Sequence, residues 1–170
     1  MKNFFGLSLL LLTLSACSAE GISKDDPEGS ANYIKEHLSI ESDIENTQEE
    51  YYMGIMDVYN IGEDIDVIAD DKDKIEQINF SDVDEDDIQN ILSMIEFPES
   101  KSIESFVDDY YMDIAATGSY EADSVFTSYE DVGVMVGTKI DILKEDSDNP
   151  FSLSLYYNPE RFEKLRETAL

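Results

Sequence analysis

Apart from its carboxylates, the chain offers few side chains that could do chemistry. Its 170 residues include one cysteine, Cys17, and one histidine, His37, against 40 aspartates and glutamates. A single cysteine and a single histidine exclude an internal disulfide and any multi-histidine metal site within one chain. His37 follows Glu36 on an expected helix, and we interpret it as an ordinary surface residue.

Carboxylates alone can catalyse hydrolysis, because a glycosidase needs only two acids at a set separation. With forty acids in the chain, no pair stands out. Alternating aspartates at Asp82, Asp84 and Asp86 resemble the start of an EF-hand loop, but that loop requires glycine at position six and glutamate at position twelve, where this chain has Asp87 and Ser93. We therefore predict no metal site, no cofactor and no catalytic residues.

The residues around Cys17 indicate export. A short positive start precedes an apolar run over residues 4–14, which is typical of a secretory signal peptide and too short to span a bilayer. The run ends in Leu14-Ser15-Ala16-Cys17, which resembles the lipobox of bacterial lipoproteins. The resemblance implies a signal peptide over residues 1–16, cleavage between Ala16 and Cys17, and lipid, palmitate included, on the Cys17 thiol. That lipid would remove the only thiol from any catalytic role.

The lipobox resemblance also suggests a location. In enterobacterial lipoproteins an aspartate after the cysteine favours the inner membrane, and here the residue is Ser18. We therefore expect a lipid anchor in the cell envelope, with the outer membrane favoured over the inner. Residues 17–30, rich in Ser, Gly, Asp and Glu, are expected to form a flexible tether, and residues 31–170 a single acidic domain.

The formal net charge is −29, with acids spread along the whole mature chain. The negative electrostatic potential of such a surface repels nucleic acid and anionic lipid headgroups, so we expect no nucleic-acid partner. Two interpretations remain open. The acidity suits a protein exposed to high salt, since the Debye length is about 3 Å at 1 M; alternatively, it serves a cationic partner. We favour the salt interpretation.

Apolar spacing predicts a mainly helical N-terminal half. We expect a helix over residues 32–39 with Ser30 as N-cap, and one long helix or two consecutive ones between Ile44 and Ile78, where apolar residues recur at threes, fours and sevens. A third helix should follow Ser81 and stop by Pro98. A fourth should run from about Ser102 to Gly118.

After Gly118 the period changes to two, which predicts strands. Residues 132–142 and 151–157 alternate apolar and polar side chains, and the acidic stretch between them suits an antiparallel hairpin. A less regular alternation over 124–129 is compatible with a third strand. Asn158 should cap a terminal helix that has Pro159 at its first position. The fold class is therefore α+β: a mainly helical N-terminal half, then a C-terminal antiparallel hairpin or small sheet followed by a terminal helix.

Three further patterns carry weaker signals. Residues 49–55 and 108–114 look alike, and we interpret the match as convergence on one amphipathic helix pattern rather than duplication. One tyrosine of each adjacent pair should face the core, leaving Tyr52, Tyr111 or Tyr156 as contact candidates. The arginines, Arg161 and Arg166, with Lys164, are expected to dock the last helix onto acidic neighbours.

From these features we expect a membrane-anchored, non-catalytic envelope lipoprotein that binds an unidentified envelope protein. One alternative is an inhibitor or immunity protein that captures a basic toxin or hydrolase. The other is a carboxylate-dependent periplasmic hydrolase, which requires two carboxylates facing each other in a concave pocket.

Overall fold

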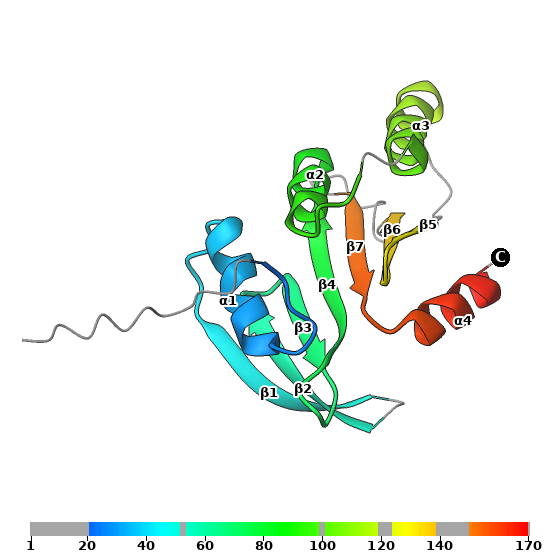
Figure 1. The fold of residues 1–170 in the computed structure, drawn as a ribbon. Coiled ribbons are helices and arrows are strands. Elements are labelled where there is room, and N and C mark those ends of the chain that lie inside the picture. The colour runs from blue at the N-terminus through cyan, green and yellow to red at the C-terminus, as the bar shows by residue number, and fades with distance from the viewer. Residues whose placement is uncertain (1–20, 52–53, 99–100, 119–123, 139–149, 170) are drawn as a thin grey trace, which may run out of the picture.

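The computed structural model describes residues 21–51, 54–98, 101–118, 124–138 and 150–169. Its centre is a seven-stranded antiparallel sheet in the order β1-β2-β3-β4-β7-β6-β5 (Figure 1). The strands are β1 (Ile44–Tyr51), β2 (Gly54–Ile61), β3 (Ile65–Ala69), β4 (Ile75–Val83), β5 (Ser124–Tyr129), β6 (Val132–Thr138) and β7 (Phe151–Tyr156). The helices are α1 (Pro27–His37), α2 (Glu85–Met94), α3 (Lys101–Thr117) and α4 (Pro159–Ala169).

The prediction of a mainly helical N-terminal half is wrong. Residues 44–83 form the four consecutive antiparallel strands β1 to β4, and helix and strand are about equally represented in the described residues. Gly54 and Gly62 have φ values of +127° and +69°, which side-chain-bearing residues rarely adopt, so the chain turns there instead of continuing a helix. The resemblance between residues 49–55 and 108–114 has no structural counterpart, because the first stretch includes parts of β1 and β2 and the second lies in α3.

The strands expected in the C-terminal half are confirmed over the described residues. β6 and β7 pair antiparallel, with Val134 opposite Leu155, and the fainter pattern over 124–129 is β5. The expected extension to Ile142 and most of the connecting turn lie outside the described residues. Asn158 caps α4 as expected, because its Oδ1 accepts a hydrogen bond from the Arg161 amide at 3.2 Å.

The other helices begin and end for local reasons. Asp84 caps α2 through a capping box with Asp87, in which each carboxylate accepts a hydrogen bond from the other residue's backbone N–H. The expected third helix is thus present, although it ends at Met94, before Pro98. The expected fourth helix is confirmed as α3, and Gly118, with a φ of +70°, follows its last residue.

The first helix begins earlier than expected, and the segment before it is packed on the domain. Residues 27–30, placed in the tether by the sequence, form the first turn of α1, whose cap is Asp26. In the segment before α1, the Lys24 carbonyl accepts a hydrogen bond from the Ile75 amide at 2.8 Å, and Lys24 Nζ donates to the Tyr157 carbonyl at 2.6 Å. Ser30 Oγ accepts from the Ser23 amide at 2.9 Å. Residues 23 and 24 are therefore bonded to α1, β4 and the end of β7.

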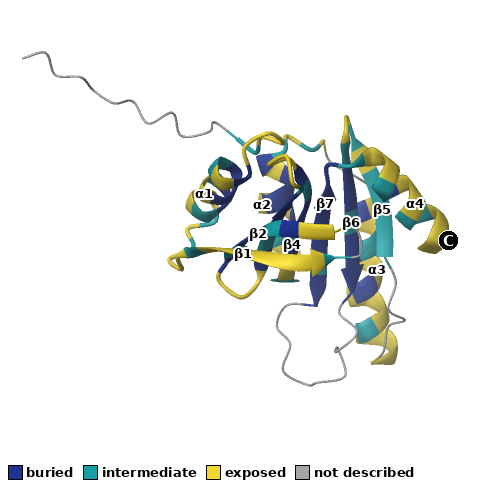
Figure 2. Ribbon diagram, turned by 90° about the horizontal axis from the view of Figure 1, so that it is seen from below, coloured by how far each residue is buried: buried dark blue, intermediate teal, exposed yellow. Residues whose placement is uncertain are grey.

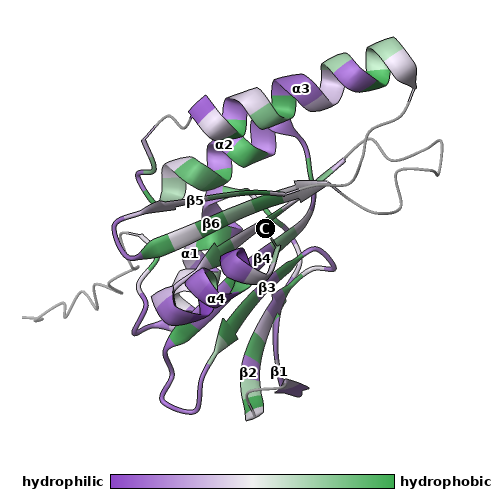
Figure 3. Ribbon diagram, turned by 90° about the vertical axis from the view of Figure 1, so that its right-hand side faces the viewer, coloured by the Kyte–Doolittle hydropathy of each residue, from purple (hydrophilic) through white to green (hydrophobic). Residues whose placement is uncertain are grey.

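One face of the sheet is apolar and carries three helices. α1 packs on β2 and β3, α3 packs on β5, and buried residues of α2 join the same core. Its largest fully buried side chains include Phe80, Phe151, Ile78 and Leu155. Figure 3 shows α2 and α3 on one side of the strands and α4 on the other.

The opposite face, called the polar face below, combines a row of polar side chains with a small buried apolar cluster of Met56, Val58 and Ile68. Asn60, Asp66, Asn79 and Ser154 stand side by side on four neighbouring strands. α4 covers β6 and β7 on this face, and it approaches the sheet closely because Gly133 leaves room for the Phe162 ring. The described part of the chain contains no helix long and apolar enough to cross a bilayer.

Candidate functional site

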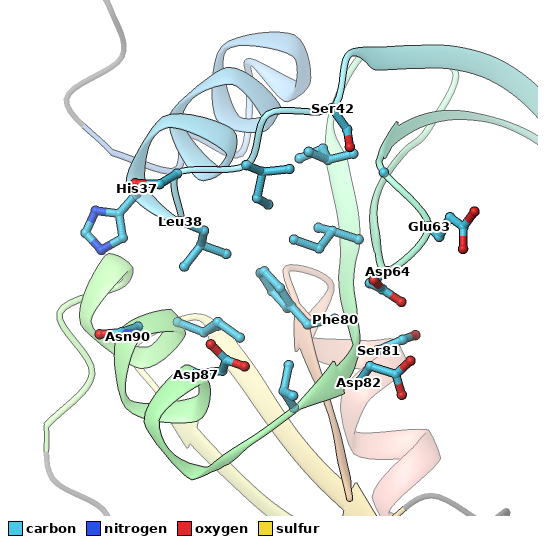
Figure 4. Close-up of a pocket in the computed structure, with 17 residues that line it drawn as sticks. His37, Leu38, Ser42, Glu63, Asp64, Phe80, Ser81, Asp82, Asp87 and Asn90 are labelled. Atoms are coloured by element: carbon cyan, nitrogen blue, oxygen red, sulfur yellow. The ribbon is translucent and has the colours of Figure 1, made fainter. Parts of the chain in front are cut away.

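A cavity of about 750 Å³ lies where four elements meet at one end of the apolar face (Figure 4). The end of α1 and the loop after it form one wall, and α2 forms another. The β2–β3 turn and the last residues of β4 complete the cavity. These elements are far apart in the sequence, and the sheet brings them together because β2, β3 and β4 are neighbours.

The floor of this cavity is apolar. Ile61, Phe80 and Ile91 line it and belong to the buried core, with 1% of each residue exposed. Leu38 and Ile40, which are half-buried, extend the apolar surface toward α1. A ligand entering the cavity would therefore contact a preformed hydrophobic surface.

The rim is acidic. Glu63, Asp64, Asp82 and Asp87 line the cavity, and none of its described lining residues is Lys or Arg. Asp64 and Asp82 lie on the same side, while Asp87 lies across Phe80 on α2 (Figure 4). This arrangement combines negative charge with an apolar floor, so it favours a cation that carries hydrocarbon and disfavours an anion.

An irregularity in β4 places Asp82 on the rim. The pairing of β4 with β7 shifts register between Phe80 and Val83, and Asp82 has a φ of 53°. At the same point the Ser81 amide donates to the Asp64 carbonyl at 2.7 Å, which ties β4 to the β2–β3 turn. Bulges of this kind redirect side chains, and they are frequent beside binding and active sites.

Asp87 has a structural role in addition to its place on the rim. Its Oδ2 accepts from the Asp84 amide at 3.2 Å, and its own amide donates to Asp84 Oδ1 at 2.8 Å. The aspartate run that resembled an EF-hand start therefore supplies the cap of α2. Among the described residues, no group of three or more histidine, cysteine, aspartate or glutamate side chains could hold a metal ion.

His37 is exposed, as the sequence suggested, but it also lines the cavity at the last residue of α1. Its ring centroid lies 5.6 Å from that of Tyr33, one turn earlier on the same helix. No sequence signal marked it as part of a site, because its partners in the cavity come from β2, β4 and α2.

The residues singled out by the sequence are elsewhere. Ala16 and Cys17 lie outside the described residues, as does Tyr52. Tyr110 is buried and Tyr111 is exposed, as expected for that pair. Tyr156 is buried beside Phe162, which argues against its being a surface contact.

The structure describes contacts for two of the basic residues of α4, Arg161 and Arg166. Arg166 pairs with Glu163, an acid of the same helix. The Arg161 guanidinium lies 5.8 Å from the centre of the Tyr156 ring, a cation–π arrangement with the sheet. Comparison with protein-family models, curated proteins and solved structures finds no match for this chain.

Proposed function

We propose that this chain is a lipid-anchored, non-catalytic binding protein of the bacterial cell envelope whose cavity receives a cationic, partly apolar group of a partner protein. The cavity carries the proposal, because it joins a buried hydrocarbon floor to a rim of four carboxylates. The lipobox resemblance at residues 14–17 supports the anchor, and Ser18 favours the outer membrane.

A lysine or arginine side chain has the chemistry that this cavity suits. Its methylene stem can lie on Phe80 and Ile61 while its charged end reaches Asp64 or Asp82. Charge-assisted hydrogen bonds to carboxylates are stronger than neutral ones, and the apolar floor lowers the local dielectric constant around them.

The anchor is tested by replacing the cysteine. Cells that express the full chain should incorporate labelled palmitate into the wild type, and Cys17→Ser should abolish the label and shift the protein from the membrane fraction to the soluble fraction. Equal labelling or equal membrane association of the two proteins would remove the anchor from the proposal.

The cavity is tested with charge-matched variants of the full chain. Asp64→Asn with Asp82→Asn should reduce capture of a stoichiometric partner from solubilised envelopes at least tenfold, as measured by quantitative mass spectrometry. Asp108→Asn with Asp109→Asn, on the exposed side of α3, makes the same change in net charge and should leave capture intact. Equal losses would mean that general acidity, rather than the cavity, attracts the partner.

The salt dependence of partner binding distinguishes the inhibitor or immunity alternative from non-specific attraction by the acidic surface. Capture of one basic toxin or hydrolase should persist at several hundred millimolar salt if it depends on desolvated contacts in the cavity. Binding that depends only on the distributed charge should be lost over the same range, and that result would favour adaptation to a saline environment.

A second candidate function is a carboxylate-dependent hydrolase, which Asp64 and Asp82 favour because they line the same concave site. Purified full chain would be assayed on peptidoglycan and on model glycosides. A turnover that Asp82→Asn lowers at least a hundredfold, with substrate binding retained, would support this function over the binding proposal.

A further inference from the structure

The two outer strands of the sheet differ in charge. β1 has the sequence IENTQEEY, with three glutamates, and its six central residues are exposed. β5 has the sequence SVFTSY, without a charged residue, although 30% of the chain is charged. Figure 2 shows β1 exposed along most of its length and β5 at intermediate burial. Charged side chains on an outer strand discourage pairing with another chain. The glutamates of β1 therefore hinder the addition of a further strand, and β5 has no such charges.

β5 also presents backbone groups for pairing. In an antiparallel ladder, alternate residues direct their N–H and C=O groups away from the neighbouring strand. Within the described residues β5 pairs with β6 alone, so from Val125 to Tyr129 alternate residues direct their backbone polar groups away from the sheet. A strand placed beside it would satisfy them in the geometry that the sheet already has.

Side chains on both faces hold β5 in position. The Tyr129 ring packs edge-on against Phe97, with centroids 5.8 Å apart, and α3 lies over the same face. On the other face, the Phe126 ring lies 6.2 Å from that of Phe162 in α4. Because β5 is ordered by these contacts before any partner arrives, little conformational entropy would be lost from it on pairing.

Charge identifies the kind of partner. The turn after β5 consists of Glu130 and Asp131, both exposed, and the chain as a whole carries −29. A second copy would bring the same negative charge, so its β5 is repelled. An extended segment with an uncharged centre and basic ends meets the neutral strand with its centre and the acidic turn with one end.

We propose that the outer edge of β5 accepts an extended segment of a cationic partner as an eighth strand. The main-chain hydrogen bonds supply affinity, and the basic ends of the segment supply selectivity for this edge. The interaction is separate from the cavity between α1 and α2 and does not require the lipid on Cys17.

The test uses purified full chain in detergent micelles and the labelled peptide Lys-Thr-Val-Thr-Val-Thr-Lys, whose lysines meet the acidic turn in either strand direction. Fluorescence anisotropy should show saturable binding, and amide exchange over residues 124–129 should slow at least tenfold. The same peptide with proline at its central position lacks the required geometry and should bind at least tenfold more weakly.

Matched variants locate the contact. Ser128→Lys places a positive charge at an exposed position of β5 and should weaken peptide binding at least tenfold. Thr47→Lys makes the same charge change at an exposed position of β1 and should alter binding less than twofold. Asp64→Asn with Asp82→Asn should retain peptide binding, which separates this proposal from the cavity.

Three results would overturn the proposal: no saturable binding below millimolar peptide, equal binding of the proline peptide, or equal losses in the two lysine variants. Protection of residues 44–51 instead of 124–129 would assign the edge to β1 and would likewise overturn it.

Discussion

The two faces of the sheet are stabilised by different interactions. The face under α1, α2 and α3 is packed with buried aliphatic and aromatic side chains that need only to exclude water. On the face shared with α4, Asn79 Oδ1 accepts from Ser154 Oγ at 2.9 Å and from the Gln77 amide nitrogen, and Asn60 Nδ2 donates to Asp66 at 2.9 Å. We therefore expect the apolar face to tolerate exchange of one aliphatic residue for another. The stability of the polar row, in contrast, depends on the hydrogen-bond partner of each side chain.

The largest effect should come from truncating the apolar face. Phe151 is fully buried and its ring centroid lies 5.0 Å from that of Tyr110. Phe151→Ala should lower the free energy of unfolding by about 3–5 kcal/mol, as measured by denaturant titration. Phe126→Ala, in a half-buried ring on the polar face, should cost roughly 1–2 kcal/mol. Equal costs would contradict the difference between the faces.

A smaller effect is expected where α4 meets the polar face. A Cβ on Gly133 would lie 2.3 Å from Cγ of Phe162, so Gly133→Val should destabilise the protein by about 1–3 kcal/mol through overpacking. In a Phe162→Ala background the same substitution should cost less, and a double-mutant cycle measures the difference. Additive losses would mean that the contact between Gly133 and Phe162 does not limit packing.

The hydrogen-bonded row should be sensitive to removal of a single acceptor. Asn79→Ala leaves the Ser154 hydroxyl and the Gln77 amide without this partner, and both residues are buried. We expect a loss of about 1–3 kcal/mol in the free energy of unfolding. Gln48→Ala, at an exposed position of β1, should change it by less than about 0.5 kcal/mol. A neutral Asn79→Ala would show that water replaces the lost side chain.

The smallest effect concerns one hydroxyl on the apolar face. Tyr157 is buried, its hydroxyl has no hydrogen-bond partner among the described residues, and burial raises the pKa of the phenol. Tyr157→Phe should therefore increase stability at neutral pH by up to about 1 kcal/mol.

The raised pKa of Tyr157 also fixes the direction of the pH dependence. The folded protein keeps the phenol proton at pH values where the unfolded chain loses it, so this contribution is complete below about pH 10 and is lost as the pH rises further. Tyr157→Phe should show a shallower loss of stability above pH 10 in unfolding experiments. An unchanged alkaline slope, or a less stable variant at pH 7, would contradict this interpretation.

The C-terminal strands could be predicted because their alternation is regular and their turn residues are distinct. The N-terminal strands could not, since β2 buries Met56 and Val58 on one face and Tyr59 and Ile61 on the other, which removes the period of two. The remaining apolar spacing then matches a helix. Gly54 and Gly62 were the signals of turns, and their positive φ values show why glycine stands there.

The cavity was not predictable from local patterns. Its carboxylates belong to a turn, a bulge and a helix cap, and in a chain with forty acids none of them stands out. Only the neighbouring positions of β2, β3 and β4 bring Asp64 beside Asp82. The sequence did place Asp82 and Asp84 at a helix start, as acids suited to the positive end of the helix dipole, but it did not identify Asp84 as the N-cap of α2.

The packing of residues 23 and 24 on the domain has a consequence at the bilayer. Only Ser18, Ala19 and Glu20 separate Cys17 from Gly21, and four fully extended residues reach at most about 14 Å. A lipid on Cys17 would therefore act as a short hinge and hold the α1 side of the molecule toward the headgroups. β5 lies five strand spacings from β2, about 24 Å across the sheet, which is farther than this four-residue linker can reach.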